Sequence, residues 1–193
     1  MMRSMTKCLL VVLLLAVPFA AACSSAPYTA KVVDAETGEP VEGAVYLAVW
    51  WKTVSGKKAW FEGASVEMAK FVEGHTDEKG WIQVPRFWFR YPFARERTLT
   101  VYKPGYVLWN QEYVFPTAER RTDFDTSSRE IELTEWKPIY RYGDQSLLLS
   151  SATKGRIRDD MYREGSQLLY ETYRDHEMHL YMEELSKGKG KKR

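Results

Sequence analysis

Short segments rich in β-forming residues, separated by turn sequences, occupy the chain from residue 28 to residue 136. The segment 97–103 (RTLTVYK) alternates apolar and polar positions, whereas 44–51 (AVYLAVWW) is a continuous apolar run typical of a buried strand. No helical pattern lies between these segments, so the spacing predicts a mainly β fold, an antiparallel β-sandwich. The predicted strands are 28–33, 44–51, the second half of 65–76, 81–84, 97–103, 106–115 and 129–136.

After the last predicted strand the pattern becomes helical. Residues 145–152 (QSLLLSSA) predict a short helix, and residues 159–187 predict a long one. In the long segment, residues suited to one packed face recur at three- and four-residue steps: Met161, Gly165, Leu168, Leu169, Thr172, Tyr173, His176 and Leu180. We therefore expect a helical extension over 137–187 and a basic, disordered tail over 188–193.

The first 22 residues have the layout of a secretory signal peptide. Arg3 and Lys7 form a positive region, and residues 9–17 form an apolar run that Pro18 ends. This run is far shorter than the roughly 20 residues that a membrane-spanning helix needs. Residues 1–22 are therefore expected to be removed after export.

Three alanines lead directly into Cys23. This AAAC sequence (20–23) resembles the lipobox of bacterial lipoproteins, although Ala20 stands where leucine is usual. The resemblance implies cleavage before Cys23, lipid attachment to its thiol and a short tether over 23–27. Ser24 is similar to the second residue of lipoproteins sorted to the outer membrane, facing the periplasm or the cell surface. Ordinary cleavage after the alanines is the alternative, and it would give a protein without an anchor.

Composition adds two limits to this picture. The chain has 28 Lys+Arg against 26 Asp+Glu, and five of the positive residues lie within the last eight positions, SKGKGKKR. The rest of the chain is mildly acidic, so no nucleic-acid partner is predicted. Cys8 would leave with the signal and Cys23 would carry lipid, so no disulfide is expected and the core alone must stabilise the fold.

Three stretches, VVDAETGEPVEGAVYL, TDEKGWIQVP and YKPGYV, resemble in order the landmarks of carboxypeptidase regulatory-like domains. The matching residues are Val33, Asp34, Thr37, Gly38, Pro40, Gly43, Ala44, Tyr46, Thr76, Asp77, Gly80, Trp81, Gly105 and Tyr106. The resemblance implies a seven-stranded, transthyretin-like (prealbumin-like) Greek-key sandwich over 28–136, with insertions near 52–66 and 86–96. It also implies a folding, spacing or binding module without catalytic residues or a cofactor.

The two insertions carry an unusual number of aromatic residues. The second contains RFWFRYPF (86–93), in which aromatic rings lie between arginines. Aromatic faces stack on sugars and cations, and arginine pairs with carboxylates and phosphates. We therefore consider a ligand-binding surface for a peptidoglycan or other glycan, a lipid head group or another envelope protein. Its candidate residues are Trp60, Phe87, Trp88, Arg90 and Tyr91. The alternative is that these rings cover an open sandwich edge or pack on the C-terminal helix.

Carboxylates gather around the first predicted turn. They are Asp34, Glu36, Glu39 and Glu42, and the next turn adds Asp77 and Glu78. Calcium needs six to eight oxygens around one point, so a calcium site would require the two turns to be neighbours. We expect a structural bend between two strands instead.

Histidine spacing also raises the question of a metal. His176 and His179 lie three residues apart on the predicted helix, with Glu183 four residues further on, and His75 precedes the second turn. Zinc sites use three or four ligands, and His176 falls on the packed face of the helix. No metal site is predicted.

Patterns of nucleophilic catalysis do not occur in the sequence. There is no G-x-S-x-G motif, no thiol would remain in the mature chain, and only three histidines could serve as a base. We therefore expect a non-enzymatic, membrane-anchored envelope lipoprotein whose sandwich is an interaction or scaffolding module. The alternatives are a carbohydrate-binding or peptidoglycan-binding module that uses the exposed aromatics and, as a third hypothesis, a transthyretin-like hydrolase.

Overall fold

The described part of the chain is mainly β, with few helical residues. A computed structural model describes residues 27–54, 65–85, 94–124, 127, 129–153, 166–172 and 174–177. The strands are β1 (Tyr28–Asp34), β2 (Val45–Val54), β3 (Ser65–His75), β4 (Trp81–Val84), β5 (Ala94–Tyr102), β6 (Trp109–Asn110), β7 (Tyr113–Val114), β8 (Glu119–Arg120) and β9 (Glu130–Leu133). Helix α3 spans Tyr142–Ala152, and residues 167–172 and 174–177 are also helical. Strand ends therefore reach into both expected insertions.

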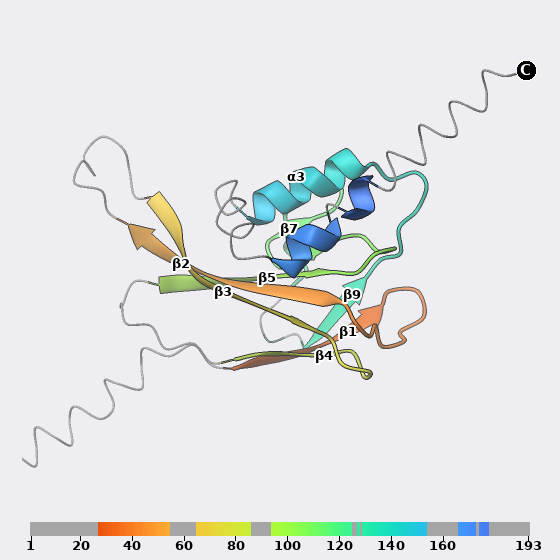
Figure 1. Cartoon of the computed structure of the whole chain (residues 1–193), viewed down its shortest axis with the longest axis horizontal. Helices are drawn as coiled ribbons and strands as arrows, with labels where there is room; N and C mark the ends of the chain where they lie inside the picture. The colour runs from red at the N-terminus through yellow and green to blue at the C-terminus, as the bar shows by residue number, and fades with distance from the viewer. Residues whose placement is uncertain are drawn as a thin grey trace, which may run out of the picture.

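Two larger sheets make the fold sandwich-like (Figure 1). One has the strand order β4-β1-β9, the other β3-β2-β5-β6, and β7 and β8 form a separate hairpin. This confirms the mainly β, sandwich-like class. The expectation of an entirely antiparallel arrangement is wrong for one pair, because β9 runs parallel to β1, with Val32 opposite Ile131. After the β7–β8 hairpin the chain reaches the edge of β1 that β4 does not occupy. Strand β9 pairs with that edge and runs in the same direction as β1.

The expected strand 106–115 is two short strands, β6 and β7, that belong to different sheets. The side chain of Asn110 explains the break. Its Oδ1 accepts hydrogen bonds from the N–H groups of Glu112 and Tyr113, at 2.8 and 3.0 Å. An asparagine that bonds the backbone two and three residues ahead favours a turn over a continued strand.

The first core lies between the two sheets. Strands β4 and β9 alternate exposed and buried residues, as strands with one packed face should. Their buried side chains meet those of β2 and β5. The main members of this core are Ala30, Val32, Tyr46, Ala48, Trp50, Ile82, Val84, Leu99, Val101, Ile131 and Leu133.

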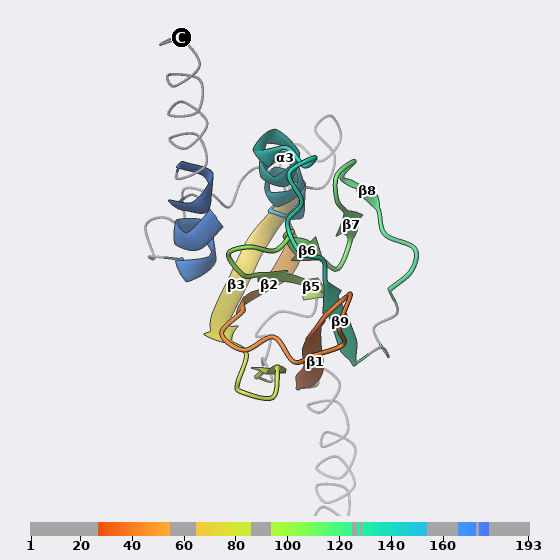
Figure 2. The same ribbon diagram turned by 90° about the vertical axis from the view of Figure 1, so that its right-hand side faces the viewer.

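A second core covers the opposite face of the four-stranded sheet. The other residues of β2, which are Val45, Leu47, Val49 and Trp51, pack there with Tyr102, Leu108, Leu148, Leu168 and Leu169. Helix α3 and the C-terminal helical residues lie over this face, opposite β1 and β9 (Figure 2). The unbroken apolar run of β2 is thereby explained, because a strand buried on both faces needs no polar alternation.

The C-terminal helical segment is tied to β3 at its first turn. The Glu73 carboxylate accepts a hydrogen bond from the Ser166 hydroxyl and others from the N–H groups of Gln167 and Leu168, at 2.8 and 3.3 Å. Ser166 itself is not helical, so the expected continuous helix over 159–187 is wrong at this residue. Helix N-termini have unpaired N–H groups and a partial positive charge, and a carboxylate satisfies both.

A second polar contact joins the helical segment to the sheet. The buried Tyr102 hydroxyl, on β5, donates a hydrogen bond to the Asp175 carboxylate. Burial, reinforced by this hydrogen bond and by the negative charge of Asp175, raises the pKa of Tyr102. The tyrosine is thus held in its neutral form at a point where the helical segment meets the second core.

This contact predicts a loss of stability in alkali. Because the folded-state pKa of Tyr102 lies above its unfolded value of 10.0, its contribution is complete below that pH and is lost as pH rises further. Above pH 10 the wild type should therefore lose unfolding free energy more steeply than Tyr102→Phe, by up to about 1.4 kcal/mol per pH unit. Denaturant titrations between pH 8 and 11 would measure this difference. Parallel profiles for the two proteins would contradict the assignment.

Candidate functional site

Most of the site residues expected from the sequence lie outside the described part of the chain. The expected lipid attachment site and the aromatic candidates stay predictions for that reason. These residues are Cys23, Trp60, Phe87, Trp88, Arg90 and Tyr91. His179 also lies outside the described residues.

The first acidic turn uses its aspartate for the backbone. Asp34 Oδ1 accepts hydrogen bonds from the N–H groups of Glu36 and Thr37, both at 2.8 Å, and from the Thr37 hydroxyl at 3.1 Å. The N–H donors of Thr37 and then Glu36 hold the pKa of Asp34 below its usual range. Glu36 forms an ion pair with Lys137 at 2.7 Å.

The second turn lies beside the first. The Thr76 hydroxyl donates to the Val41 carbonyl at 2.6 Å and accepts from the Ala44 N–H at 2.8 Å, which joins the two turns. Asp77 Oδ1 is used within its own turn, by the N–H groups of Lys79 and Trp81. Among the described residues, no three His, Cys, Asp or Glu side chains gather as metal ligands would.

His176 is part of an aromatic contact. Its ring stacks on Tyr142 of α3, with centroids 5.7 Å apart, and Tyr142 stacks on Trp136 at 4.2 Å. His75 is exposed at the end of β3. The two described histidines are therefore on different elements, and one of them, His176, packs against the ring of Tyr142.

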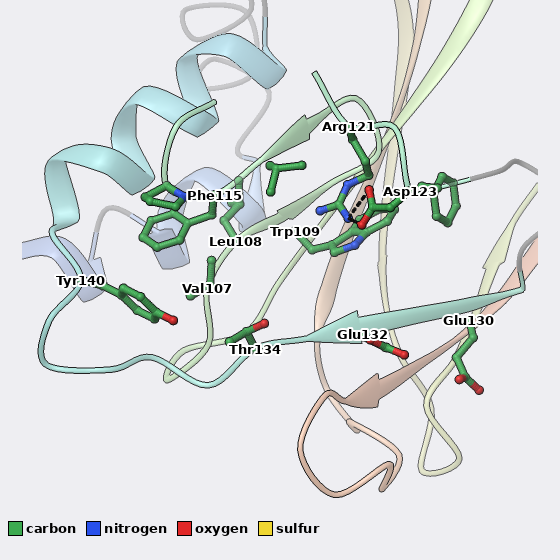
Figure 3. A pocket seen from close by; sticks show the side chains of 13 residues that line it. Val107, Leu108, Trp109, Phe115, Arg121, Asp123, Glu130, Glu132, Thr134 and Tyr140 are labelled. Carbon is green, nitrogen blue, oxygen red and sulfur yellow. Dashed lines mark hydrogen bonds and ion pairs between the residues drawn. The ribbon is translucent and has the colours of Figure 1, made fainter. Parts of the chain in front are cut away.

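A cavity of about 510 Å³ opens at the side of the sandwich, where each sheet ends (Figure 3). Strand β6 is the last strand of one sheet and β9 is the last strand of the other. The cavity lies between these two edge strands, and the β7–β8 hairpin and the segment after it bound its remaining side. Its lining comes from residues 107–109, 114–116, 121, 123, 124, 130, 132, 134 and 140.

The two edge strands diverge from a hydrogen-bonded junction. The Val107 N–H donates to the Thr134 carbonyl at 2.8 Å, and an isolated antiparallel bridge pairs Tyr106 with Glu135. Beyond this junction the chain turns into β6, where Trp109 pairs with Val101 of β5. The cavity is therefore a wedge-shaped space between β6 and β9, which diverge beyond this junction.

An arginine and its partners form one end of the wedge. The Arg121 Nε donates to the Asn110 carbonyl at 2.9 Å, and its Nη1 lies 3.0 and 3.2 Å from the two Asp123 carboxylate oxygens. The guanidinium also lies over the Trp109 ring, 5.1 Å from the centroid. The Phe124 ring meets the same indole edge-on at 4.9 Å. The charge of Arg121 is thus matched by Asp123 before any ligand arrives.

Aromatic side chains form the other end. Phe115 meets Tyr140 edge-on, with centroids 5.0 Å apart, and the Trp136 ring contacts both, with centroid distances of 6.0 and 5.7 Å. Because these rings contact one another and Trp109 is covered by Arg121, the cavity does not offer the broad open ring face that stacking on a sugar requires.

Sequence reasoning did not single out any residue of this cavity. The lining residues come from five separate segments, and none of them forms a motif. One local signal was available, namely the polar stretch TAERRTD (117–123), in which a charged hairpin follows a short apolar segment. Whether this stretch lines a cavity depends on how distant strands pair, and residue spacing does not predict that pairing.

Comparisons with known proteins assign no family to the chain. No family model matches it, and no curated protein matches it. Among solved structures it is similar to the C-terminal domain of the shaft pilin spaA from Lactobacillus rhamnosus GG, with 16% identity and a TM-score of 0.28. That match covers 58% of this chain and 100% of the pilin domain, and at this TM-score it carries no argument about function. No helix in the described part is long and apolar enough to span a membrane.

Proposed function

We propose that the protein is a non-enzymatic lipoprotein of the cell envelope, anchored in the outer membrane by lipid on Cys23, and that its β-sandwich is an interaction module. The lipobox-like AAAC sequence after an apolar run supports the anchor. Several acyl chains, at about 0.8 kcal/mol for each buried methylene, would hold such a protein firmly on a membrane.

The same proposal includes the finer fold, a carboxypeptidase regulatory-like, transthyretin-like Greek-key sandwich. Three strands in one sheet and four in the other are compatible with it. The positions of the motif residues support it further, because Asp34 and Asp77 each organise a turn and Thr76 joins the two turns. These residues thus organise and join the two turns, which is the structural role that the resemblance implies for them.

The observation that carries the interaction role is the cavity between β6 and β9. It combines apolar lining residues, a pre-formed ion pair and an exposed strand edge in one accessible place. The C-terminal helical segment is a weaker candidate for recognition, because Leu168 and Leu169 are buried against the sheet. We therefore place partner recognition at the cavity, with the aromatic insertions as a second, separate candidate surface.

The anchor is tested by metabolic labelling with a fatty acid. The full chain should incorporate label and should fractionate with outer membranes, whereas Cys23→Ser should lose both properties because no thiol remains to be acylated. Cys8→Ser is the matched control, since it removes a cysteine inside the expected signal and should leave labelling unchanged. Labelling that persists in Cys23→Ser, or a wild type found wholly outside the membrane fraction, would contradict the anchor.

A further inference from the structure

The edge of β9 that faces the cavity carries backbone groups that its pairing with β1 does not use. In the parallel ladder, the Lys31 N–H donates to the Arg129 carbonyl at 2.6 Å and the Ala35 N–H donates to the Leu133 carbonyl at 2.9 Å. Along one edge of a strand, such bonds come from alternate residues. The N–H and C=O of Glu132, which lies between these positions, therefore point away from β1 and toward the cavity.

Trp109, the residue that would pair with Glu132, belongs to the other sheet. The junction between Val107 and Thr134 starts an antiparallel pairing, and its register would bring Trp109 opposite Glu132. Trp109, on β6, instead pairs with Val101 of β5. Among the described residues, no hydrogen bond joins the outward N–H or C=O of Glu132 to another group. An unpaired strand edge of this kind is a template for a further strand.

Side chains along this edge specify what could pair there. Glu130 and Glu132 are exposed and lie on the same face of β9, two residues apart. Glu130 has Lys31 beside it on β1, whereas Glu132 has Val33, so the sheet gives the second carboxylate no cationic neighbour. The opposite side of the cavity is mixed, because apolar residues such as Val107 lie there together with the Arg121–Asp123 ion pair.

We propose that an extended peptide segment of a partner protein adds to the open edge of β9 as a further strand, with lysine or arginine opposite Glu132. This inference rests on the proposed interaction role and names its partner class. An added strand would lie about 4.8 Å from β9, inside the space that β6 vacates. Its backbone would complete the ladder, its basic residues would lie beside the carboxylates, and the apolar residues between them would face the cavity wall.

Peptide binding to the full chain tests the charge pattern. Labelled peptides of sequence KVKVKVK and EVEVEVE would be titrated by fluorescence anisotropy, with SKGKGKKR, the chain's own last eight residues, as a third probe. We expect KVKVKVK to bind at least about ten-fold more tightly than EVEVEVE, because like charges would face each other in the second complex. Equal binding of these two peptides would overturn the pattern. Tighter binding of SKGKGKKR would assign the edge to this chain's own tail and overturn the assignment to a partner.

Two substitutions at one position separate backbone pairing from charge. Glu132→Pro removes the N–H that faces the cavity but leaves the ladder to β1, because proline is tolerated where the N–H of an edge strand points outward. Glu132→Ala keeps that N–H and removes only the carboxylate. We expect Glu132→Pro to weaken KVKVKVK binding at least about ten-fold, and Glu132→Ala to reduce only the preference for basic peptides.

A second measurement keeps the test decisive if Glu132→Pro fails to fold. Methylating alternate peptide nitrogens of KVKVKVK in one phase should abolish binding to the wild type, whereas methylating the other phase should not. Bound peptide should also slow hydrogen exchange of the Glu132 amide. Binding that neither methylation phase changes, or an amide that gains no protection, would overturn the added strand. If envelope cross-links then fall only on the aromatic insertions, the strand inference fails while the proposed interaction role stands.

Discussion

Replacing Leu168 with alanine is expected to lower the free energy of unfolding by about 2–5 kcal/mol. Leu168 is fully buried in the second core, where it packs among side chains of β2, β5 and α3. Removing its three outer carbons leaves a cavity in addition to losing apolar burial, and a packed neighbourhood closes such a space only in part. A loss of this size would show that the packing of the C-terminal helical segment stabilises the sandwich.

Tyr170 is the matched control for this prediction. It lies on the same helical segment but is 57% exposed, so Tyr170→Ala should change stability by no more than about 0.5 kcal/mol. Denaturant titrations of the full chain measure both values under identical conditions. Equal, small effects at the two positions would mean that the segment does not dock on the sheet in solution.

Replacing Gly80 with alanine should be comparably damaging for a different reason. Gly80 has a φ of 76°, and a Cβ atom there would overlap the carbonyl oxygen of Val32. A left-handed conformation costs an alanine about 1–2 kcal/mol, and forcing extra volume into a packed site adds about 1–3 kcal/mol. The obstacle is backbone rather than a movable side chain, so β1 itself would have to shift.

Gly38 allows the two causes to be separated. Its φ of 72° is nearly the same, yet nothing lies within 4 Å of a Cβ atom built there. Gly38→Ala should therefore cost only the conformational part, about 1–2 kcal/mol. Thermal or denaturant unfolding of the two variants gives the difference directly. If Gly80→Ala were no worse than Gly38→Ala, the second turn would not pack against β1 as described.

The strands with one packed face were the most predictable part of the fold. WIQV and EIEL alternate in sequence, and β4 and β9 alternate in burial in the same way. Local periodicity reports which face of a strand is covered, and here that was sufficient. The first turn was also predictable, because the aspartate and threonine of its sequence bond to the turn backbone in the structure.

The second core was visible in the sequence but was not interpreted as such. AVYLAVWW predicts a strand, and its lack of polar positions also predicts that both faces are covered, here by α3 and the C-terminal helical residues on one side. The non-helical conformation of Ser166 was less accessible, because the partner of its side chain is a carboxylate on β3, Glu73, far away in sequence. Helical periodicity cannot register a partner of that kind.

The cavity could not be predicted from local patterns. It exists because β6 and β9 part after one hydrogen-bonded junction and because β9 pairs with β1 in parallel. Both facts concern strands that are distant in the chain, and each lining residue is unremarkable within its own segment. The candidate site is therefore a property of topology, whereas the expected aromatic site was a property of composition.

Site-specific photo-cross-linking in intact envelopes tests the central proposal most directly. A photoreactive amino acid would replace Glu132 at the open edge of β9 in the full chain, and in a second variant it would replace Leu147, which is 53% exposed on α3. The proposal predicts a discrete cross-linked partner from position 132 that is absent from position 147, with the cross-linked peptide rich in lysine or arginine. No adduct from position 132, or the same adducts from both positions, would contradict it.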